Sequence, residues 1–397
     1  MPLRVLVVDR APPVNLTQGN ALIGLELFSR LSEHELTLAC PSADPQQTLA
    51  DERLRSIFRR TYVVERKTWT PAISGWMEGR AASILPVAHG LMGAAGAFQR
   101  LLAMLLASND FDVVHTRQLP MSAYTASGGR AGRLLELVDS ETLGAERATP
   151  RTWRTRSRSL AAAFIESRVI PRYDVVTTVA EADAARLRAL ARGARIEVVP
   201  NGVDADRFIT GSAAEQNEER IVFVGAMSYA PNIAAVQYFA RQVLPLIRSD
   251  RPNAEFVIVG RDPAPSVQAL AGDGVQVTGG VDDVRPYMEE AAVVVVPMQS
   301  GSGIKNKVLE ALAMERAVVA TPLAVEGIAA TPGEHLLVAS GARELADGVL
   351  RLLADPDERR RLGRAGRRLV TDQYTWDACA ATYETLWHEL AELGRRR

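Results

Sequence analysis

The chain has 397 residues, of which 47% are hydrophobic and 23% are charged, and its formal net charge at pH 7 is −1. This length favours two domains, because single cores stop growing at about 250 to 300 residues. The composition is typical of a globular enzyme and excludes a general electrostatic attraction to nucleic acid. The two cysteines, Cys40 and Cys379, lie too far apart to indicate a disulfide framework or a cysteine-based zinc site, so we expect a cytoplasmic protein.

The first apolar segments of the chain predict secondary structure rather than targeting signals. Residues 1–8 are interrupted too soon by Asp9 for a signal peptide and predict a first strand. Residues 84–107 are the most apolar stretch, but they contain Arg100 and several glycines, which makes a membrane span unfavourable. We expect packed helices there, or an amphipathic surface that touches lipid.

Short β-branched runs alternate with longer helical patterns along the whole chain, which predicts parallel sheets. The strands predicted in the first half are residues 3–8, 36–39, 62–64, 112–115, 134–138, 175–179 and 196–199. Those predicted in the second half are residues 221–224, 256–259, 275–277, 293–296, 318–320 and 336–338. The polar residues 210–219 resemble a linker between the halves. We therefore predict two Rossmann-like α/β domains, residues 1–209 and 220–375, and a terminal helix, residues 376–397, that returns to the first domain.

Residues 297–313 carry the strongest local signal, a buried strand end followed by a glycine turn and an amphipathic helix. Gly301 and Gly303 allow backbone N–H groups to approach an anion, and a helix N-terminus favours negative charge. Lysine occurs only at Lys67, Lys305 and Lys307, although the chain has 46 basic residues. Two of the three lysines at one glycine turn indicate phosphate contact, whereas the alternative is a solvated first helical turn.

Glu310 follows these lysines in an apolar context, where an unpaired carboxylate is costly. Its partner is either a ribose hydroxyl pair or an arginine. The sequence therefore leaves open whether Glu310 binds a ligand or pairs with an arginine.

Seven segments have the order and spacing of one known family. They are Asp112-Val-Val-His115, residues 173–183, Pro200-Asn-Gly-Val-Asp204, Phe223-Val-Gly225, residues 281–287, residues 303–313 and residues 321–327. In this set the chain resembles glycosyltransferase family 4, the retaining enzymes whose two Rossmann-like domains face each other across a cleft. The resemblance covers nearly the whole chain.

This resemblance implies a set of donor-binding residues. Glu310 matches the second glutamate of the family's pair and implies ribose binding, whereas the first glutamate falls at Ser302. The arginine and lysine that often contact the diphosphate fall at Ala226 and Asn232. We infer that Lys305 and Lys307 neutralise the diphosphate instead. The donor-binding set implied is Gly19, Gly225, Val281, Ser302, Gly303, Ile304 and Lys307, and the catalytic set is His115, Lys305 and Glu310.

Candidate acceptor or membrane contacts lie in the first half. His115 ends a predicted strand, at the edge where open α/β sheets bind ligands, and Arg117 shares its face. Five arginines surround Trp153 in residues 147–158. This run is either a solvated face or a contact with anionic lipid or a lipid-linked acceptor. The candidates are Arg117, Arg151, Trp153 and Arg154.

The sequence lacks the patterns of several other enzyme classes. It has no Gly-x-Gly-x-x-Gly dehydrogenase turn, no Gly-Lys pair of a P-loop and no zinc-ligand spacing among its histidines. We expect no metal and no cofactor beyond a nucleotide diphosphate sugar as co-substrate. The predicted function is a retaining glycosyltransferase of polysaccharide or glycolipid assembly, acting in the cytoplasm or at the inner face of the cell membrane. The alternatives are a non-hydrolysing sugar-nucleotide epimerase, a phosphorylase and a nucleotide-sugar-binding protein without transfer activity.

Overall fold

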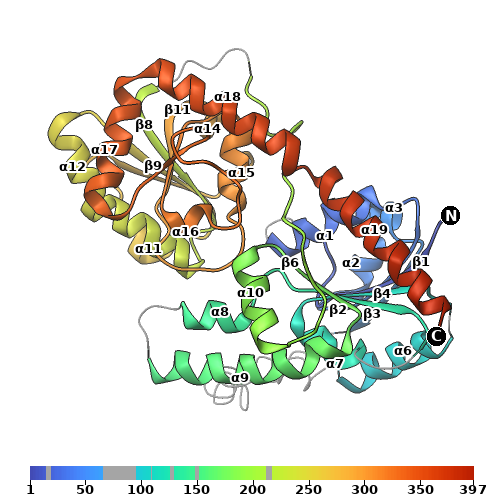
Figure 1. Ribbon diagram of the computed structural model, residues 1–397. Coiled ribbons are helices and arrows are strands. Elements are labelled where there is room, and N and C mark those ends of the chain that lie inside the picture. The colour runs from blue at the N-terminus through green and yellow to red at the C-terminus, as the bar shows by residue number, and fades with distance from the viewer. Residues whose placement is uncertain (15–18, 66–94, 109, 126–128, 148–151, 212–216) are drawn as a thin grey trace. The chain divides into compact units, whose positions relative to one another are not determined.

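The computed structural model describes residues 1–14, 19–65, 95–108, 110–125, 129–147, 152–211 and 217–397. These residues form two compact units. The first contains Met1–Pro200 and Trp376–Arg397, and the second contains Asn201–Thr375. Each unit is built on one parallel sheet, so the prediction of two Rossmann-like α/β domains is confirmed (Figure 1).

The first unit has a seven-stranded sheet in the order β3-β2-β1-β4-β5-β6-β7, with every pair parallel. Because the chain leaves β1 toward β2 and later returns to β4 on its other side, the strand order reverses between β1 and β4. Its strands are β1 (Arg4–Val8), β2 (Glu35–Ser42), β3 (Arg60–Glu65), β4 (Val113–Arg117), β5 (Gly132–Glu136), β6 (Val175–Thr178) and β7 (Ile196–Val198).

Helices cover both faces of this sheet. Alternate residues of β1 show this, since Val5 and Val7 belong to one apolar core and Leu6 and Val8 to another. The helices are α1 (Gly19–Arg30), α2 (Pro45–Ala50), α3 (Glu52–Ile57), α6 (Ala95–Ala107), η1 (Leu119–Met121), α7 (Ser122–Thr125), α8 (Glu141–Glu146), α9 (Trp153–Val169), η2 (Ile170–Arg172), α10 (Glu181–Leu190) and α19 (Trp376–Arg395).

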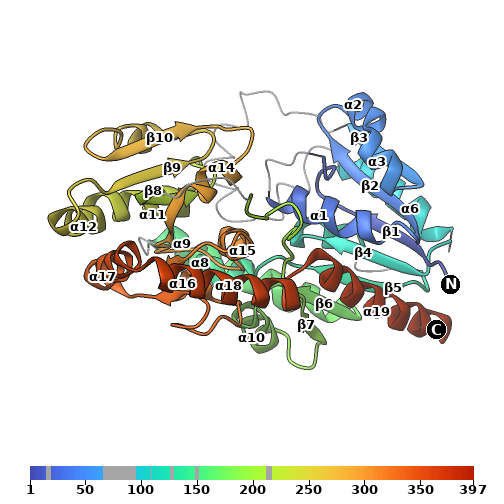
Figure 2. The same cartoon turned by 90° about the horizontal axis from the view of Figure 1, so that it is seen from above.

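The second unit repeats this topology with six strands in the order β10-β9-β8-β11-β12-β13, as Figure 2 shows for β10, β9 and β8. Its strands are β8 (Asn217–Val224), β9 (Glu255–Val259), β10 (Val275–Gly279), β11 (Ala291–Val296), β12 (Val318–Ala320) and β13 (Leu337–Val338). Its helices are α11 (Ala230–Tyr238), η3 (Phe239–Val243), α12 (Leu244–Asp250), α13 (Pro265–Gln268), α14 (Arg285–Glu289), α15 (Asn306–Ala313), α16 (Pro322–Val325), α17 (Gly341–Ala354) and α18 (Pro356–Gln373).

Each predicted strand overlaps a strand of the structure. The run of valines at residues 293–296 lies in β11, whose six residues are all buried. This is the environment that a central parallel strand covered on both faces requires.

The domain boundary lies earlier than the sequence indicates. The chain enters the second unit at Asn201, not within residues 210–219. Residues 201–211 pack on that unit: the Val203 N–H donates to the Tyr374 carbonyl, and the Arg367 guanidinium donates to the Ala205 and Phe208 carbonyls. The second unit therefore begins before the polar segment, and β8 already begins at Asn217.

The apolar stretch at residues 84–107 lies partly outside the described residues. Its described part forms α6, whose Phe98, Leu102 and Leu105 are buried against β1 and β2. Among the described residues no helix combines the length and apolarity needed to cross a membrane.

The terminal helix α19 packs on the first unit at unusually close range. A Cβ atom on Gly132 in β5 would lie 2.4 Å from the Leu390 carbonyl oxygen, and one on Gly394 would lie 2.6 Å from the Arg130 carbonyl oxygen. Glycine at both positions lets the helix backbone touch the strand. Trp387, fully buried, then fills the space between α19 and α1.

We expect Gly132→Ala to destabilise the first unit by about 1 to 3 kcal/mol, because the added methyl group meets backbone and cannot be relieved by a rotamer change. The matched control is Gly96→Ala in α6, where the new Cβ would only meet the end of the Arg100 side chain. Urea denaturation of both variants measures the difference. Equal stability of the two variants contradicts the close packing of α19.

Candidate functional site

The candidate site lies in the second unit where its strand order reverses, between β8 and β11. Ligands bind at this place in open α/β sheets, beyond the carboxyl ends of the strands. Gly225 directly follows β8, and the loop of residues 297–305 follows β11. Gly301 and Gly303 have φ angles of 117° and 67°, which the turn requires and which other residues adopt only at a cost.

Helix α15 starts from this loop with its positive end toward the sheet edge. Val308, Leu309 and Leu312 bury its apolar face, which fixes the direction of the helix. Lys305 occupies the N-cap position and makes no side-chain capping bond, so the first N–H groups of the helix lack that partner. The Asn201 amide donates to the Asn306 side chain at 3.1 Å and steadies the first turn. A helix start without such a cap is a favourable place for an anion.

Two ammonium groups lie at the start of α15. The Lys305 Nζ donates to the carbonyl oxygens of Ser302 and Gly303, at 2.8 and 2.6 Å. The Lys307 Nζ donates to the Asn232 Oδ1 at 2.6 Å and lies 4.7 Å from the centre of the Phe223 ring. Burial, with the neighbouring Lys305 charge, lowers the pKa of Lys307 to about 7, although Glu310 opposes this shift. The site therefore places two ammonium groups, each held by neutral oxygens, at the start of the helix.

Glu310 lies one turn beyond Lys307 on the same helix and is partly buried. Among the described residues its carboxylate makes no hydrogen bond and no close ion pair, although the charge of Arg207, an arginine as considered from sequence, acts on it. Burial raises the pKa of Glu310, against the opposing charges of Lys307 and Arg207. An unpaired carboxylate in this position is available to a ligand hydroxyl pair.

The remaining donor-binding candidates differ in how close they lie to this glycine turn. A Cβ on Gly225 would lie 2.7 Å from the Asn232 amide and 3.2 Å from the Lys307 Nζ, so this glycine makes room for the lysine. Ile304 is buried and anchors the loop, and Ser302 contributes its carbonyl to Lys305. Val281 follows the edge strand β10, two strands away from β8. Gly19 is the first residue of α1 in the other unit.

The structure contradicts a catalytic role for His115 that requires contact with the sugar. His115 lies in the middle of β4, and its side chain is completely buried in the first unit. The Trp387 indole N–H donates to Nδ1 at 3.3 Å, so Nε2 carries the proton and donates to Glu136 at 2.9 Å. Burial lowers the pKa of His115, in keeping with a neutral ring. The prediction failed because the strand extends beyond His115, and α19 covers that face.

Arg117 is likewise not a surface contact to acceptor or membrane. Its guanidinium is buried and binds both oxygens of Glu136, at 2.9 and 3.0 Å, as well as the Asp9 carboxylate. A further N–H donates to the Asn20 carbonyl at the start of α1. Burial opposes ionisation of Glu136, but Arg117 and His115 outweigh it and lower its pKa to about 2. Arg117 and His115 do share a face, and their common partner is Glu136.

The other acceptor or membrane candidates lie on α9. Trp153 and Arg154 are the first two residues of this helix and are exposed. Arg151 lies outside the described residues. The exposure of Trp153 leaves it free to meet another surface.

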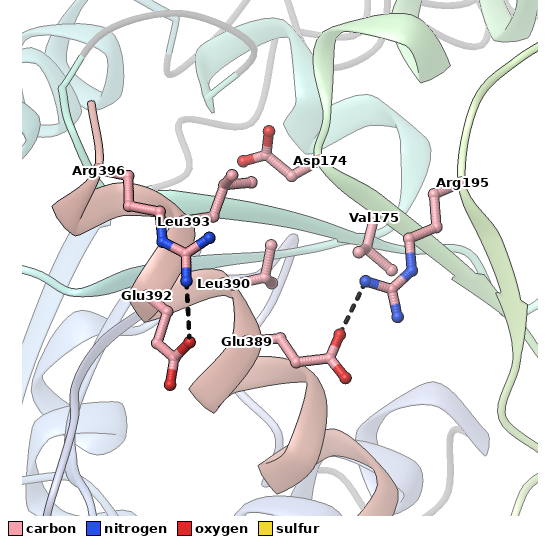
Figure 3. A pocket seen from close by; sticks show the side chains of 8 residues that line it. All are labelled: Asp174, Val175, Arg195, Glu389, Leu390, Glu392, Leu393 and Arg396. Carbon is pink, nitrogen blue, oxygen red and sulfur yellow. Dashed lines mark hydrogen bonds and ion pairs between the residues drawn. The ribbon is translucent and has the colours of Figure 1, made fainter.

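Two further features of the described residues are alternative candidates for a site. His34, Glu384 and His388 are close enough to hold a metal ion, but the Leu3 N–H donates to His34 Nδ1, so Nε2 of the neutral ring carries the proton and cannot bind metal. A pocket of about 210 Å³ lies beside β6, β7 and α19 (Figure 3). Its charged groups pair with one another, as Arg195 does with Glu389, and it lies at the amino ends of the strands. For these reasons we assign the donor site to neither feature.

Sequence reasoning missed two supporting residues of the donor site. Asn232 was noted only as the place where a family lysine is absent, yet it receives the Lys307 ammonium. Asn201 was noted only as part of a motif, yet it holds the first residue of α15. Both contacts join segments far apart in the sequence, and no local pattern reports them.

Comparison with known proteins gives the class of this site. The family described as "Glycosyltransferase Family 4" matches residues 29–207, and the family described as "Glycosyl transferases group 1" matches residues 218–355. Together the two matches span most of the chain, and they meet near residues 208–217, a little after the unit boundary at Asn201. The protein belongs to these glycosyltransferases, whose two-domain architecture is the GT-B fold.

Named relatives show the same class. A GDP-mannose-dependent alpha-(1-6)-phosphatidylinositol monomannoside mannosyltransferase of Mycobacterium tuberculosis is 30% identical over 233 residues. The match covers 52% of this chain and 60% of that protein, so it spans less than two thirds of the relative. An alpha-maltose-1-phosphate synthase of Mycolicibacterium smegmatis is 26% identical, over 69% of this chain and 80% of that protein.

Solved structures share the fold at low identity. The sucrose-phosphate synthase of Thermosynechococcus elongatus aligns with a TM-score of 0.77 and 18% identity, over 98% of this chain and 99% of that one. HepE of Anabaena in complex with UDP-glucose aligns with a TM-score of 0.68 and 13% identity, over 97% and 99% of the two chains. These likenesses establish the fold.

Proposed function

We propose that this protein transfers a hexosyl group from a nucleoside diphosphate sugar to an acceptor hydroxyl, with retention of the anomeric configuration, in glycolipid or polysaccharide assembly. The observation that carries the proposal is the convergence of two ammonium groups, an uncapped helix start and an unpaired carboxylate at the sheet edge of the second unit. Their signs match a diphosphate followed by a ribose.

In this proposal each group of the site has a separate task. The diphosphate lies at the start of α15, where Lys305, Lys307 and the first N–H groups of the helix neutralise it. Glu310 accepts hydrogen bonds from the ribose hydroxyls. As the bond between the anomeric carbon and the phosphate oxygen breaks, negative charge grows on the diphosphate. The same cationic groups stabilise that charge, which lowers the barrier.

We infer retention of the anomeric configuration from the resemblance to glycosyltransferase family 4. The acceptor hydroxyl attacks the anomeric carbon on the face from which the diphosphate departs. We further propose that lysine charge performs the neutralisation, so that a divalent metal is not required. Activity is then expected to survive addition of EDTA, and a loss of activity that Mg²⁺ or Mn²⁺ restores contradicts this part of the proposal.

The donor can be found by a thermal-shift screen of GDP-mannose, UDP-glucose and related donors. GDP-mannose is the first candidate, because the printed name of the mycobacterial relative gives it as that enzyme's donor. A ligand at a hundred times its dissociation constant adds about 2.7 kcal/mol of stability, which shifts the melting temperature measurably.

Donor turnover then separates the proposed enzyme from the alternatives. Slow hydrolysis of the donor without acceptor, with release of the α-anomer from an α-linked donor in an immediate proton NMR spectrum, supports a retaining transferase. Binding without any hydrolysis favours a nucleotide-sugar-binding protein. Conversion of the bound sugar into its 2-epimer favours the epimerase.

A further inference from the structure

We propose that the outer face of α9 docks on an anionic lipid bilayer, with Trp153, Leu160 and Phe164 entering the interface and arginines contacting the lipid headgroups. This inference concerns where the enzyme works and is independent of the donor chemistry. It rests on exposure, helical spacing and charge.

Three large apolar side chains of α9 are exposed along one stripe. The exposed fractions of Trp153, Leu160 and Phe164 are 69%, 68% and 62%. Their spacing of seven and then four residues places them on one side of a helix with 3.6 residues per turn. Isolated exposed apolar residues need no explanation, but an aligned set that includes two aromatic rings does.

The opposite side of α9 is fixed to the protein. Ala162 and Glu166 are buried there, where α8 and α10 pack, as Figure 1 shows. The Glu166 carboxylate accepts hydrogen bonds from the hydroxyls of Ser140 and Thr142 and from the Glu141 N–H. Because Glu166 holds the rotation of the helix, the apolar stripe cannot turn inward.

The charged side chains that α9 itself exposes are all cationic. Glu166, which is buried, is the one acidic residue of α9, whereas Arg154, Arg156 and Arg168 are exposed beside the stripe. Within the described parts of the chain, none of these three arginines forms an ion pair with a carboxylate. The Arg154 and Arg168 guanidinium groups lie 5.5 and 5.1 Å from the Trp153 and Phe164 ring centres.

This combination of charges and apolar groups favours a lipid surface over a protein partner or a second copy. A helix with cationic flanks and aromatic or aliphatic groups on one side lies in the headgroup region of anionic bilayers. Aromatic rings are favoured at that depth, and each nearby arginine strengthens binding roughly fivefold. A second copy of this face would bring like charges together, which opposes self-association.

The test is co-sedimentation of the full chain with vesicles of phosphatidylcholine alone or with 30 mol% phosphatidylglycerol. We expect binding to the anionic vesicles that falls steeply with added salt. The triple variant Arg154→Gln, Arg156→Gln, Arg168→Gln is expected to weaken it by about 100-fold. The matched control removes the same charge from α18, as Arg360→Gln, Arg364→Gln, Arg368→Gln, and should bind like the wild type.

The apolar stripe is tested separately by Trp153→Ser, Leu160→Ser, Phe164→Ser, with Leu49→Ser as the control at another exposed leucine. We expect the stripe variant to lose vesicle binding and to keep the wild-type melting temperature. Tryptophan emission should shift to shorter wavelength on vesicles in the wild type, and Trp153→Phe should reduce this shift while it still binds.

Three results would overturn the proposal. The first is equal binding to neutral and anionic vesicles, and the second is vesicle binding that survives both the arginine and the serine variants. The third is a dimer in solution that the serine variant abolishes, because it assigns the stripe to a second copy of the chain.

Discussion

Replacing Lys307 by methionine is expected to weaken nucleoside diphosphate binding by about 10- to 100-fold at pH 6, because one charge-assisted hydrogen bond contributes about 1.5 to 3 kcal/mol. The loss should shrink as pH rises above 7. In the free protein the pKa of Lys307 is lowered to about 7 by burial, so at higher pH the wild-type amine is neutral and must take up a proton to meet the diphosphate. Titration calorimetry at pH 6 to 9 measures this.

The lowered pKa of Lys307 also affects the free energy of unfolding of the ligand-free protein. Below pH 7 the lysine is charged in both folded and unfolded chains, and its burial penalty is fully present. Between pH 7 and the unfolded value of 10.5, the unfolded chain holds a proton that the folded chain does not. Stability of the wild type should therefore rise through this window relative to Lys307→Met.

An exposed cation of the same unit provides the control for both measurements. Arg364→Met should show neither the affinity loss nor the pH trend. The ionisation of the diphosphate itself is common to all three proteins and cancels in the comparison. An affinity ratio between wild type and Lys307→Met that stays constant from pH 6 to 9 contradicts the buried, partly neutral lysine.

Replacing Arg117 by methionine is expected to destabilise the first unit by about 3 to 5 kcal/mol, because it leaves two buried carboxylates without their cation. Asp9 and Glu136 are each only a few per cent exposed, and both bind the Arg117 guanidinium. The start of α1 loses its anchor as well, since Arg117 donates to the Asn20 carbonyl. Urea denaturation gives the free energy of unfolding.

Arg4→Met is the matched control for Arg117→Met. Arg4 also pairs with an aspartate, Asp112, but its side chain is about half exposed. Exposed pairs contribute about 0 to 1 kcal/mol, so this variant should unfold nearly like the wild type. If Arg117→Met proves no less stable than Arg4→Met, the buried charge network does not support the fold as described here.

The fold could be predicted from local patterns because buried parallel strands have a recognisable hydrophobic pattern in the sequence. A strand such as β11, buried on both faces, requires an uninterrupted apolar run, and valine supplies it. The unit boundary could not be predicted in the same way. Residues 201–211 bind the second unit through their backbone carbonyls, and such bonds do not depend on side-chain type.

The candidate residues of the two units differed in how far local sequence could predict their roles. The glycine turn, the lysines and Glu310 are contiguous, so their chemistry could be read from composition and spacing. The role of His115 depends on Trp387, which lies 272 residues away and covers the ring from α19. A histidine in a strand looks the same in sequence whether a helix covers its ring or leaves it exposed.

The most direct test of the donor site compares two ligands in two variants by titration calorimetry. The ligands are whichever of GDP and UDP binds the wild type, and the corresponding nucleoside. Lys305→Ala should weaken diphosphate binding by about 10- to 100-fold and leave nucleoside binding almost unchanged. Glu310→Gln should weaken both, because both carry the ribose. Equal losses of affinity for the nucleoside and the diphosphate in Lys305→Ala would contradict this donor site. They would show that Lys305 holds the loop through its contacts with Ser302 and Gly303 and does not contact the phosphate.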